Sequence, residues 1–203
     1  MGEKPEFPAL DSHGIVRLER DGLEEGPIYA FILERGESLL RIREFYDFVD
    51  FGVSILRRED LTAVRAGEDE RVYGEILAAL GVSPDHPLEP ESAEPEAAPA
   101  EGSGWLEVPL GSWEDCLSFL KGEDAFVAIE SESGENAGTF LVGIPSEIEG
   151  GQLWLLPCDS RGRWDEEEVA IDLAEITRVQ VDNPYLRGLS LYAAQRLEYL
   201  EPG

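Results

Sequence analysis

The chain is poor in the residues that most often carry catalysis and metal binding. It contains two cysteines and two histidines. Nucleophilic catalysis needs a Ser or Cys beside a His, and His13 and His86 lie in a leader and in a linker, outside both predicted cores. Cys116 and Cys158 have no nearby Cys or His to complete a metal site, so both are interpreted as buried small hydrophobic residues and not as a disulfide. No catalytic, cofactor-binding or metal-ligating residue is predicted.

Long hydrophobic runs are also absent. No apolar stretch approaches the roughly 20 residues that span a bilayer, and the start MGEKPEFPAL lacks the basic and apolar segments of a signal peptide. We therefore expect a soluble cytoplasmic protein without a membrane partner.

Basic residues are scarce as well. The chain has 44 acidic and 16 basic residues, which gives a formal net charge of −28. A field of this sign repels phosphate backbones and disfavours nonspecific binding of DNA or RNA, whereas it favours solubility, cations and basic protein partners. An adaptation to high salt, or a compositional bias of the lineage, is the alternative explanation of the acidic charge. The charge thus narrows the class of partner without identifying one.

What the chain does contain is a division into two halves. Residues 83–104 hold five prolines and six acidic residues, with no aromatic residue and one leucine. Such a segment cannot bury enough apolar surface to offset the entropy of ordering it, and its prolines and like charges keep it extended. We predict a first domain over residues 1–82, an acidic linker over 83–104 and a second domain over 105–203.

Each half carries five short runs that are apolar or that alternate between apolar and polar residues. Glycine and acidic turn residues separate them, which is typical of consecutive antiparallel strands. The runs of the first half are GIVRLERDG, PIYAFILERG, SLLRIREFY, FGVSILRRE and LTAVRAG. Those of the second half are AFVAIESES, AGTFLVGIPSE, QLWLLPCD, EEVAIDLAE and ITRVQVD. We therefore expect a mainly β protein with a few helices.

A helix is predicted after the fifth strand of each half. The first begins at Asp69, ends near Gly81 and has one apolar face, formed by Val72, Ile76, Leu77 and Leu80. The second begins with Asn183 as N-cap and Pro184 at the first helical position, and its apolar stripe is Leu186, Leu189, Ala193 and Leu197.

The second half adds a leading helix, SWEDCLSFLKGE. In it Ser112 and Asp115 have capping-box spacing, and its apolar face is formed by Trp113, Cys116, Leu117 and Leu120. The first half has only FPALDSHG at that place, which is too short for the same helix.

The segments that close the two halves echo each other, as DLTAVRAGEDERVYGEIL and EITRVQVDNPYLRGLSL. The aligned pairs are Leu61 with Ile176, Thr62 with Thr177, Val64 with Val179, Gly74 with Gly188 and Leu77 with Leu191. We interpret the chain as a duplicated five-stranded domain, each copy closed by a helix.

A helix followed by five short, strongly bent strands is the order of elements in the Sm-like fold, a small barrel related in shape to SH3 barrels. The stretch FLVGIPSEIEGGQLWLLPCDSRGRWDEEEVAIDLAEITRVQVDNPYLRGL resembles uncharacterised bacterial Sm-like proteins from their strand 2 to their strand 5. The first half resembles them through AFILERGESLLRIREF and ILRREDLTAV. The resemblance implies two five-stranded Sm-like barrels in tandem, each followed by a helix and the second also preceded by one.

The resemblance does not carry over an RNA site. RNA-binding Sm proteins are expected to have an Asp and an Asn between strands 2 and 3, and an Arg-Gly pair between strands 4 and 5. The loops here read PSEIEGG and ERGES at the first place, and DLAE and RRED at the second. Arg187 and Gly188 form such a pair, but inside the predicted helix after strand 5. RNA binding is kept as an alternative that the charge disfavours.

Aromatic residues crowd the connection between the third and fourth strands of the first half, REFYDFVDFG, whereas its counterpart CDSRGRWDEEE is polar apart from Trp164. Such residues either cover the end of their own barrel or anchor an interface. In one version of the second role, the aromatic loop or an exposed strand edge mediates packing between the two repeats, or homo-oligomerisation, as Sm-like barrels do through strands 4 and 5. Nearby arginines predict a basic patch, although their pairing with Glu34, Glu37, Glu44 and Glu59 on a solvated face is favoured. The candidate interaction surface consists of Phe45, Tyr46, Phe48, Phe51, Arg41, Arg43, Arg57 and Arg58.

The leading hypothesis is a non-enzymatic interaction or scaffold module of tandem Sm-like barrels. Its partner is an unknown protein, for which the charge favours a basic one, or a second copy, because Sm-like barrels associate through strands 4 and 5. RNA binding is the first alternative. A small hydrolase that uses carboxylates or a metal, for instance through Asp159, Asp165 and Glu166, is the second.

Overall fold

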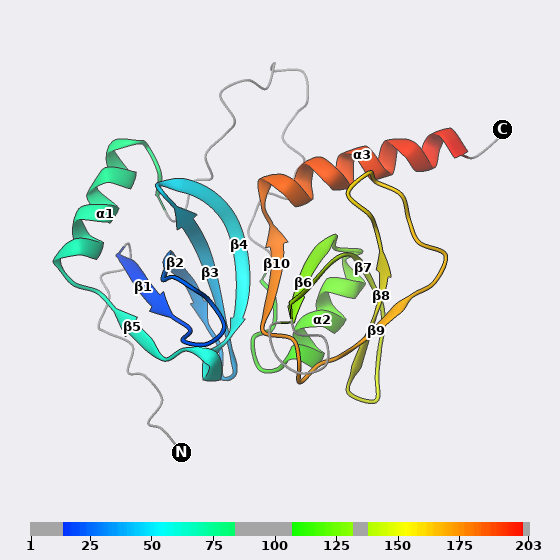
Figure 1. Cartoon of the computed structure of the whole chain (residues 1–203), viewed down its shortest axis with the longest axis horizontal. Helices are drawn as coiled ribbons and strands as arrows, with labels where there is room; N and C mark the ends of the chain where they lie inside the picture. The colour runs from blue at the N-terminus through cyan, green and yellow to red at the C-terminus, as the bar shows by residue number, and fades with distance from the viewer. Residues whose placement is uncertain (1–13, 84–106, 132–137, 201–203) are drawn as a thin grey trace.

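A computed structural model describes residues 14–83, 107–131 and 138–200 (Figure 1). The chain is mainly β, and its ten strands form one antiparallel sheet in the order β5-β1-β2-β3-β4-β10-β6-β7-β8-β9. The strands of the first half are β1 (Ile15–Glu19), β2 (Ile28–Arg35), β3 (Leu39–Tyr46), β4 (Val49–Arg57) and β5 (Ala63–Arg65). Those of the second half are β6 (Val127–Ser131), β7 (Thr139–Glu149), β8 (Gln152–Pro157), β9 (Val169–Asp172) and β10 (Arg178–Asp182).

Three α-helices and one short 3₁₀ helix complete the described structure: α1 (Glu68–Ala79), α2 (Trp113–Gly122), α3 (Pro184–Leu200) and η1 (Arg58–Asp60). All ten predicted strands and all three predicted helices are present. The predicted linker lies outside the described residues, apart from Ser83, as do His13 and His86. No helix in the described part of the chain is long and apolar enough to cross a membrane.

The prediction of two separate five-stranded barrels was wrong. The sheet is continuous from one half to the other, and it does not close on itself: β5 and β9 are its two edges. The physical reason is the pairing of β4 with β10, in which Ile55 lies opposite Val179 and Ser54 opposite Gln180. Because β10 also pairs with β6, it belongs to the ladders of both halves. We call the β4–β10 pairing the seam.

Within each half, the strand order is the same: fifth, first, second, third, fourth. Val64 of β5 lies opposite Leu18 of β1, and Val179 of β10 lies opposite Ile129 of β6, so the strand portions of the echo occupy corresponding positions. The ladder between the second and third strands shifts register once in each half, after Ile32 and after Pro145. Such β-bulges bend a strand locally, and here they fall at matching places.

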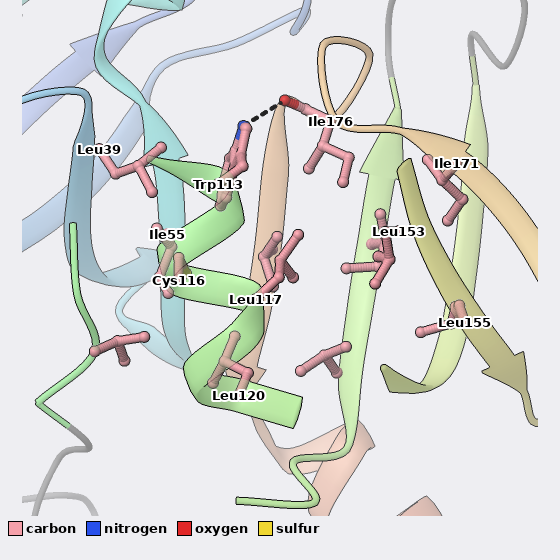
Figure 2. Packing of buried hydrophobic residues seen from close by; sticks show 14 of the residues in the cluster. Leu39, Ile55, Trp113, Cys116, Leu117, Leu120, Leu153, Leu155, Ile171 and Ile176 are labelled. Atoms are coloured by element: carbon pink, nitrogen blue, oxygen red, sulfur yellow. Dashed lines mark hydrogen bonds between the residues drawn. The ribbon is translucent and has the colours of Figure 1, made fainter. Parts of the chain in front are cut away.

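Helix α2 forms as predicted. The Ser112 hydroxyl accepts a hydrogen bond from the Asp115 N–H at 3.1 Å, which caps the helix. Its four predicted apolar residues are buried, and their cluster includes Leu39 and Ile55 from the first half (Figure 2). Trp113 Nε1 donates to the carbonyl of Ile176 at 2.9 Å, which also ties the helix to the segment before β10. The two halves therefore share this core cluster.

The closing helices differ from each other. Asn183 caps α3 as predicted, because its Oδ1 accepts from the Leu186 N–H at 2.7 Å. Leu186, Leu189 and Ala193 are buried, whereas the side chain of Leu197 lies outside the described residues.

The apolar face predicted for α1 was wrong in three of its four residues, because Val72, Ile76 and Leu80 are exposed and only Leu77 is buried. The helix packs through Tyr73 and Leu77, one turn apart. Leu191, which the echo pairs with Leu77, is exposed. The echo therefore holds for the strands and fails for the helices, since a helix can present either of two apolar stripes.

Both cysteines are free and buried, as expected. Burial raises the pKa of the Cys116 thiol to about 12, with Asp115 adding to the effect. Cys116 therefore acts as a core residue between α2 and the sheet.

Candidate interaction surface

The hairpin that joins β3 to β4 turns on Asp47 and Phe48. Both have positive φ, 47° and 65°. Two consecutive residues with positive φ make the kind of turn whose twist matches an antiparallel pair of strands. For residues other than glycine, however, this conformation costs roughly 1–2 kcal/mol each. The surroundings must therefore hold this turn in place.

Tyr73 of α1 holds the turn. Its hydroxyl oxygen accepts a hydrogen bond from the Phe48 N–H at 2.9 Å, and its ring lies 4.4 Å from the Phe48 ring, centroid to centroid. The other face of Tyr73 stacks on Tyr29 of β2 at 4.5 Å. Burial raises the pKa of Tyr73, so the hydroxyl stays neutral at physiological pH. Tyr73 lies outside the apolar stripe that the sequence predicts for this helix, which contains Val72 and Ile76.

Beyond this anchor, the hairpin exposes three large apolar side chains, which we call the aromatic tip: Tyr46, Val49 and Phe51. Their exposed fractions are 67%, 59% and 51%. Tyr46 lies opposite Val49 in the ladder, and the rings of Tyr46 and Phe51 meet edge to face at 6.1 Å. The three side chains thus form one small apolar surface.

The other two predicted aromatic residues are internal. Phe45 is buried and packs edge to face against Phe31 at 5.4 Å. Phe48 is half-buried against Tyr73. Phe45 and Phe48 thus pack onto their own half, while Tyr46 and Phe51 face outward.

The predicted arginines do not gather into one basic surface. Arg43 is fully buried and binds Asp50 through Nη2 at 2.7 Å and Nε at 3.2 Å, and its Nη1 donates to the carbonyl of Ser83 at 2.7 Å. Arg41 is also buried and forms the predicted pair with Glu34, at 2.9 Å. The hydropathy of arginine suggested a solvated strand face, but in the folded chain both guanidinium groups are taken up by local partners.

Arg57 and Arg58 serve as connectors. Arg57 donates across the seam to the carbonyls of Ala174 and Ile176, at 2.9 and 2.8 Å, and pairs with Glu59 at 3.3 Å as predicted. Arg58 donates to the carbonyl of Gly36 at 2.5 Å. These two arginines therefore hold loops and strands together.

A largely buried polar cluster at the seam was not predicted. The guanidinium of Arg178, on β10, contacts three carboxylates. It forms an ion pair with Glu24 and lies 3.4 Å from the carboxylate of Glu130 and 3.8 Å from that of Glu44. Ser54 of β4 donates to Glu44, which links the cluster to the first half. These residues are far apart in the sequence, and only the alternation of Arg178, Gln180 and Asp182 on one face of β10 hinted at a polar face.

At the end of the seam nearest the aromatic tip, β4 and β10 approach closely. Gly52 has φ +87°, and a Cβ at this position would overlap the carbonyl oxygen of Asp182. Burial raises the pKa of Asp182, Arg187 lowers it in part and the nearby Asp50 raises it further. Asp47, Asp50 and Asp182 thus lie beside the tip, where Arg43 pairs with Asp50 and Arg187 pairs with Asp182.

Comparison with protein-family models, with curated proteins and with solved structures gives no match for this chain. Within residues 14–83, 107–131 and 138–200, no group of three or more His, Cys, Asp or Glu side chains is placed to hold a metal ion.

Proposed function

We propose that this chain is a non-enzymatic, cytoplasmic protein-interaction module of two Sm-like halves, and that the aromatic tip is its binding surface. One observation carries the proposal: the hairpin adopts a costly turn, anchored by Tyr73, and that turn exposes Tyr46, Val49 and Phe51 together. Aromatic side chains exposed on a rigid support are the residues that most often dominate binding energy at protein interfaces.

The Sm-like assignment is supported by the strand order. Each half has its fifth strand beside its first, and β4 of the first half pairs with β10, the fifth strand of the second. Association through strands 4 and 5 is how Sm-like barrels pack together. The seam thus resembles an interface between two Sm-like subunits within one chain.

The surroundings of the tip favour a basic protein as partner. Asp47 lies at its rim, beside the ion pairs of Asp50 with Arg43 and of Asp182 with Arg187, and the whole chain has a formal net charge of −28. An apolar side chain flanked by Lys or Arg would fit both the tip and its rim, and the opposite charges would steer association. RNA binding has no comparable support, because the arginines that suggested it donate to carboxylates and backbone carbonyls.

The test is partner capture with a matched control. The immobilised wild-type chain is compared with the double variant Tyr46→Ser, Phe51→Ser and with Leu191→Ser, which alters a side chain on α3 that is 67% exposed. We expect a protein that binds the wild type and the control, in a salt-sensitive manner, and that binds the tip variant at least about thirtyfold more weakly.

Self-association is measured on the same three proteins by light scattering. An oligomer that the tip variant disrupts would identify a second copy as the partner. If the tip variant and the control retain every bound protein equally, and neither changes the oligomeric state, the aromatic tip is not a binding surface.

A further inference from the structure

The second half has a free strand edge at β9, the last strand of the sheet. Within the described part of the chain β9 pairs with β8 only, with Ile171 opposite Leu153. The N–H of Leu173 donates to the carbonyl of Gly151 at 2.9 Å. Since hydrogen-bonded pairs alternate along an antiparallel ladder, the N–H groups of Ala170 and Asp172 point away from β8. An edge of this kind can pair with another extended chain.

The first half shows that the corresponding edge accepts a strand. Ile171 occupies in β9 the position that Leu56 occupies in β4, because the two lie opposite Leu153 and Leu40 in ladders with the same bulge. In the first half this edge is covered by β10, antiparallel. The fold is therefore compatible with an antiparallel strand added beside β9.

The contacts that hold the seam are not repeated at β9. By the same correspondence, Arg57, which donates to two carbonyls across the seam, is replaced by Asp172. The positions equivalent to Glu44 and Ser54 are held by Pro157 and Val169 in the second half. On the incoming strand, the position of Arg178 would be held by Ala63 of β5. A second copy that added its β5 to β9 would thus lack the polar contacts of the seam.

The charge around β9 indicates a different occupant. Residues 164–177 contain six acidic residues and no Lys or Arg. Ile171 points into the core. Because side chains alternate along a strand, Glu168, Ala170 and Asp172 lie on the opposite face. The side chains of Glu168 and Asp172 are exposed, and Ala170 is half-buried. An incoming strand with Lys or Arg at every second residue would place its cations beside Glu168 and Asp172.

We infer that β9 is a docking edge for an extended basic segment of another polypeptide, which adds to the sheet as an eleventh strand. The N–H groups of Ala170 and Asp172 and the carbonyl of Ala170 supply the pairing, since the Asp172 carbonyl already accepts from the Glu175 N–H at 3.0 Å. The carboxylates select the charge of the strand. This edge belongs to the other half of the chain from the aromatic tip, so the two surfaces are separable.

The probe is a short peptide of alternating lysine and valine, labelled for fluorescence anisotropy, with the full-length chain. We expect binding that weakens as salt is added. The same peptide methylated at every backbone nitrogen keeps its charge but cannot donate hydrogen bonds, and we expect it to bind at least about fivefold more weakly. On binding of the unmethylated peptide, amide exchange should slow at Ala170 and Asp172.

Two variants test the protein side. Ala170→Pro removes an N–H that faces away from β8, which leaves the β8 ladder intact, and we expect an affinity loss of about fivefold or more. Glu168→Lys is compared with Glu123→Lys, an exposed position at the end of α2 that gives the same change in net charge. We expect a loss of about tenfold for the first and less than about twofold for the second.

Equal binding of the methylated peptide, or equal affinities of Glu168→Lys and Glu123→Lys, would reduce the interaction to nonspecific charge attraction and overturn the inference. An oligomer of the chain alone that Ala170→Pro disrupts would show that a second copy occupies β9, which also overturns it. The variant Tyr46→Ser, Phe51→Ser should bind the peptide like the wild type, which distinguishes this edge from the proposed function of the tip.

Discussion

The third and fourth strands are joined in two different ways in the two halves. In the first half, two residues, Asp47 and Phe48, connect β3 to β4, and β4 is nine residues long. In the second half, residues 158–168 connect β8 to β9, which has four residues. The same strand order therefore yields a long fourth strand that can support the seam, and a short one that remains an edge.

The loop of the second half is organised by its own polar contacts. Asp159 accepts from Arg163 Nη2 at 2.6 Å and from the N–H groups of Arg161 and Arg163, at 2.9 and 3.0 Å. These hydrogen bonds lower the pKa of Asp159 to about 2. The first half anchors its turn with aromatic rings instead. The second connection also lies against a helix, because a Cβ at Gly162 would meet the Tyr192 ring of α3. The two connections therefore differ in length and in the contacts that fix their turns.

Within the seam, we expect the largest loss of stability when Arg178 is replaced. The change Arg178→Met leaves Glu44 and Glu130 without the cation that they share, while Glu24 keeps its ion pair with Arg20 at 2.9 Å. Breaking a buried ion pair by removing one partner typically costs about 3–5 kcal/mol, so the free energy of unfolding in urea should fall by that order. Arg65→Met is the control, because Arg65 of the edge strand β5 forms an exposed ion pair with Glu19 of β1. Removing such a surface ion pair is expected to cost about 0–1 kcal/mol.

Adding Glu44→Gln to Arg178→Met should recover part of the loss, because one uncompensated carboxylate disappears. If Arg178→Met and Arg65→Met destabilise the chain equally, the cluster at the seam is no more important than a surface ion pair, and the contrast between the seam and the outer edge fails.

The close approach of β4 to β10 is tested at Gly52. In Gly52→Ala, an alanine must adopt φ +87°, and its Cβ overlaps the carbonyl oxygen of Asp182. We therefore expect the free energy of unfolding to fall by about 3 kcal/mol. Gly22→Ala has the same φ but no atom within 4 Å of the new Cβ, and only the backbone cost of roughly 1–2 kcal/mol is expected. Urea unfolding of both variants separates the two effects, and equal losses would mean that the strands can move apart at no cost.

Local patterns predicted the elements well. The alternation of apolar residues placed all ten strands, and Ser112 and Asn183 were recognised as caps because a cap acts on N–H groups two or three residues away. Packing between the two halves through an exposed strand edge was one alternative that the sequence left open beside homo-oligomerisation, but the residues that pair across the join were not predicted. The pairing of Ile55 with Val179 depends on residues more than a hundred positions apart, and nothing in either strand alone identifies its partner.

The surface was predicted only in part, for a related reason. Tyr46 and Phe51 are exposed as an interface would require, but the aromatic pattern does not distinguish them from Phe45 and Phe48, which pack inward. The sequence predicts Arg43 as a solvent-exposed side chain. Its burial could not be predicted, because it depends on the turn that brings Asp50 beside it. Side-chain burial follows from tertiary packing, which a short sequence window does not contain.

The anchoring of the first hairpin is tested by Tyr73→Phe. The ring contacts with Tyr29 and Phe48 remain, but the Phe48 N–H loses its acceptor. We expect a loss of about 1 kcal/mol in urea unfolding, with faster amide exchange at Phe48. Tyr185→Phe on α3, where the side chain is 48% exposed, provides a control for removing a hydroxyl, and a loss as large there would assign no special role to Tyr73.

The smallest effect is expected at Asp182, where the acidic end of the seam titrates. Burial raises its pKa above the ordinary 3.8, so the native chain binds this proton more tightly than the unfolded chain. Its contribution to the free energy of unfolding is therefore favourable in acid and declines as the pH rises from 3.8 through the raised pKa.

Asp182→Asn removes this titration, although it also weakens the contact with Arg187, 3.1 Å away. Relative to the wild type, the variant should gain stability as the pH rises from about 4 to 7, by less than about 1 kcal/mol because the side chain is partly exposed. Asp165→Asn, in the connection of the second half, serves as the control. A stability difference for Asp182→Asn that does not change with pH would mean that the carboxylate at the seam is as well solvated as one in the open loop.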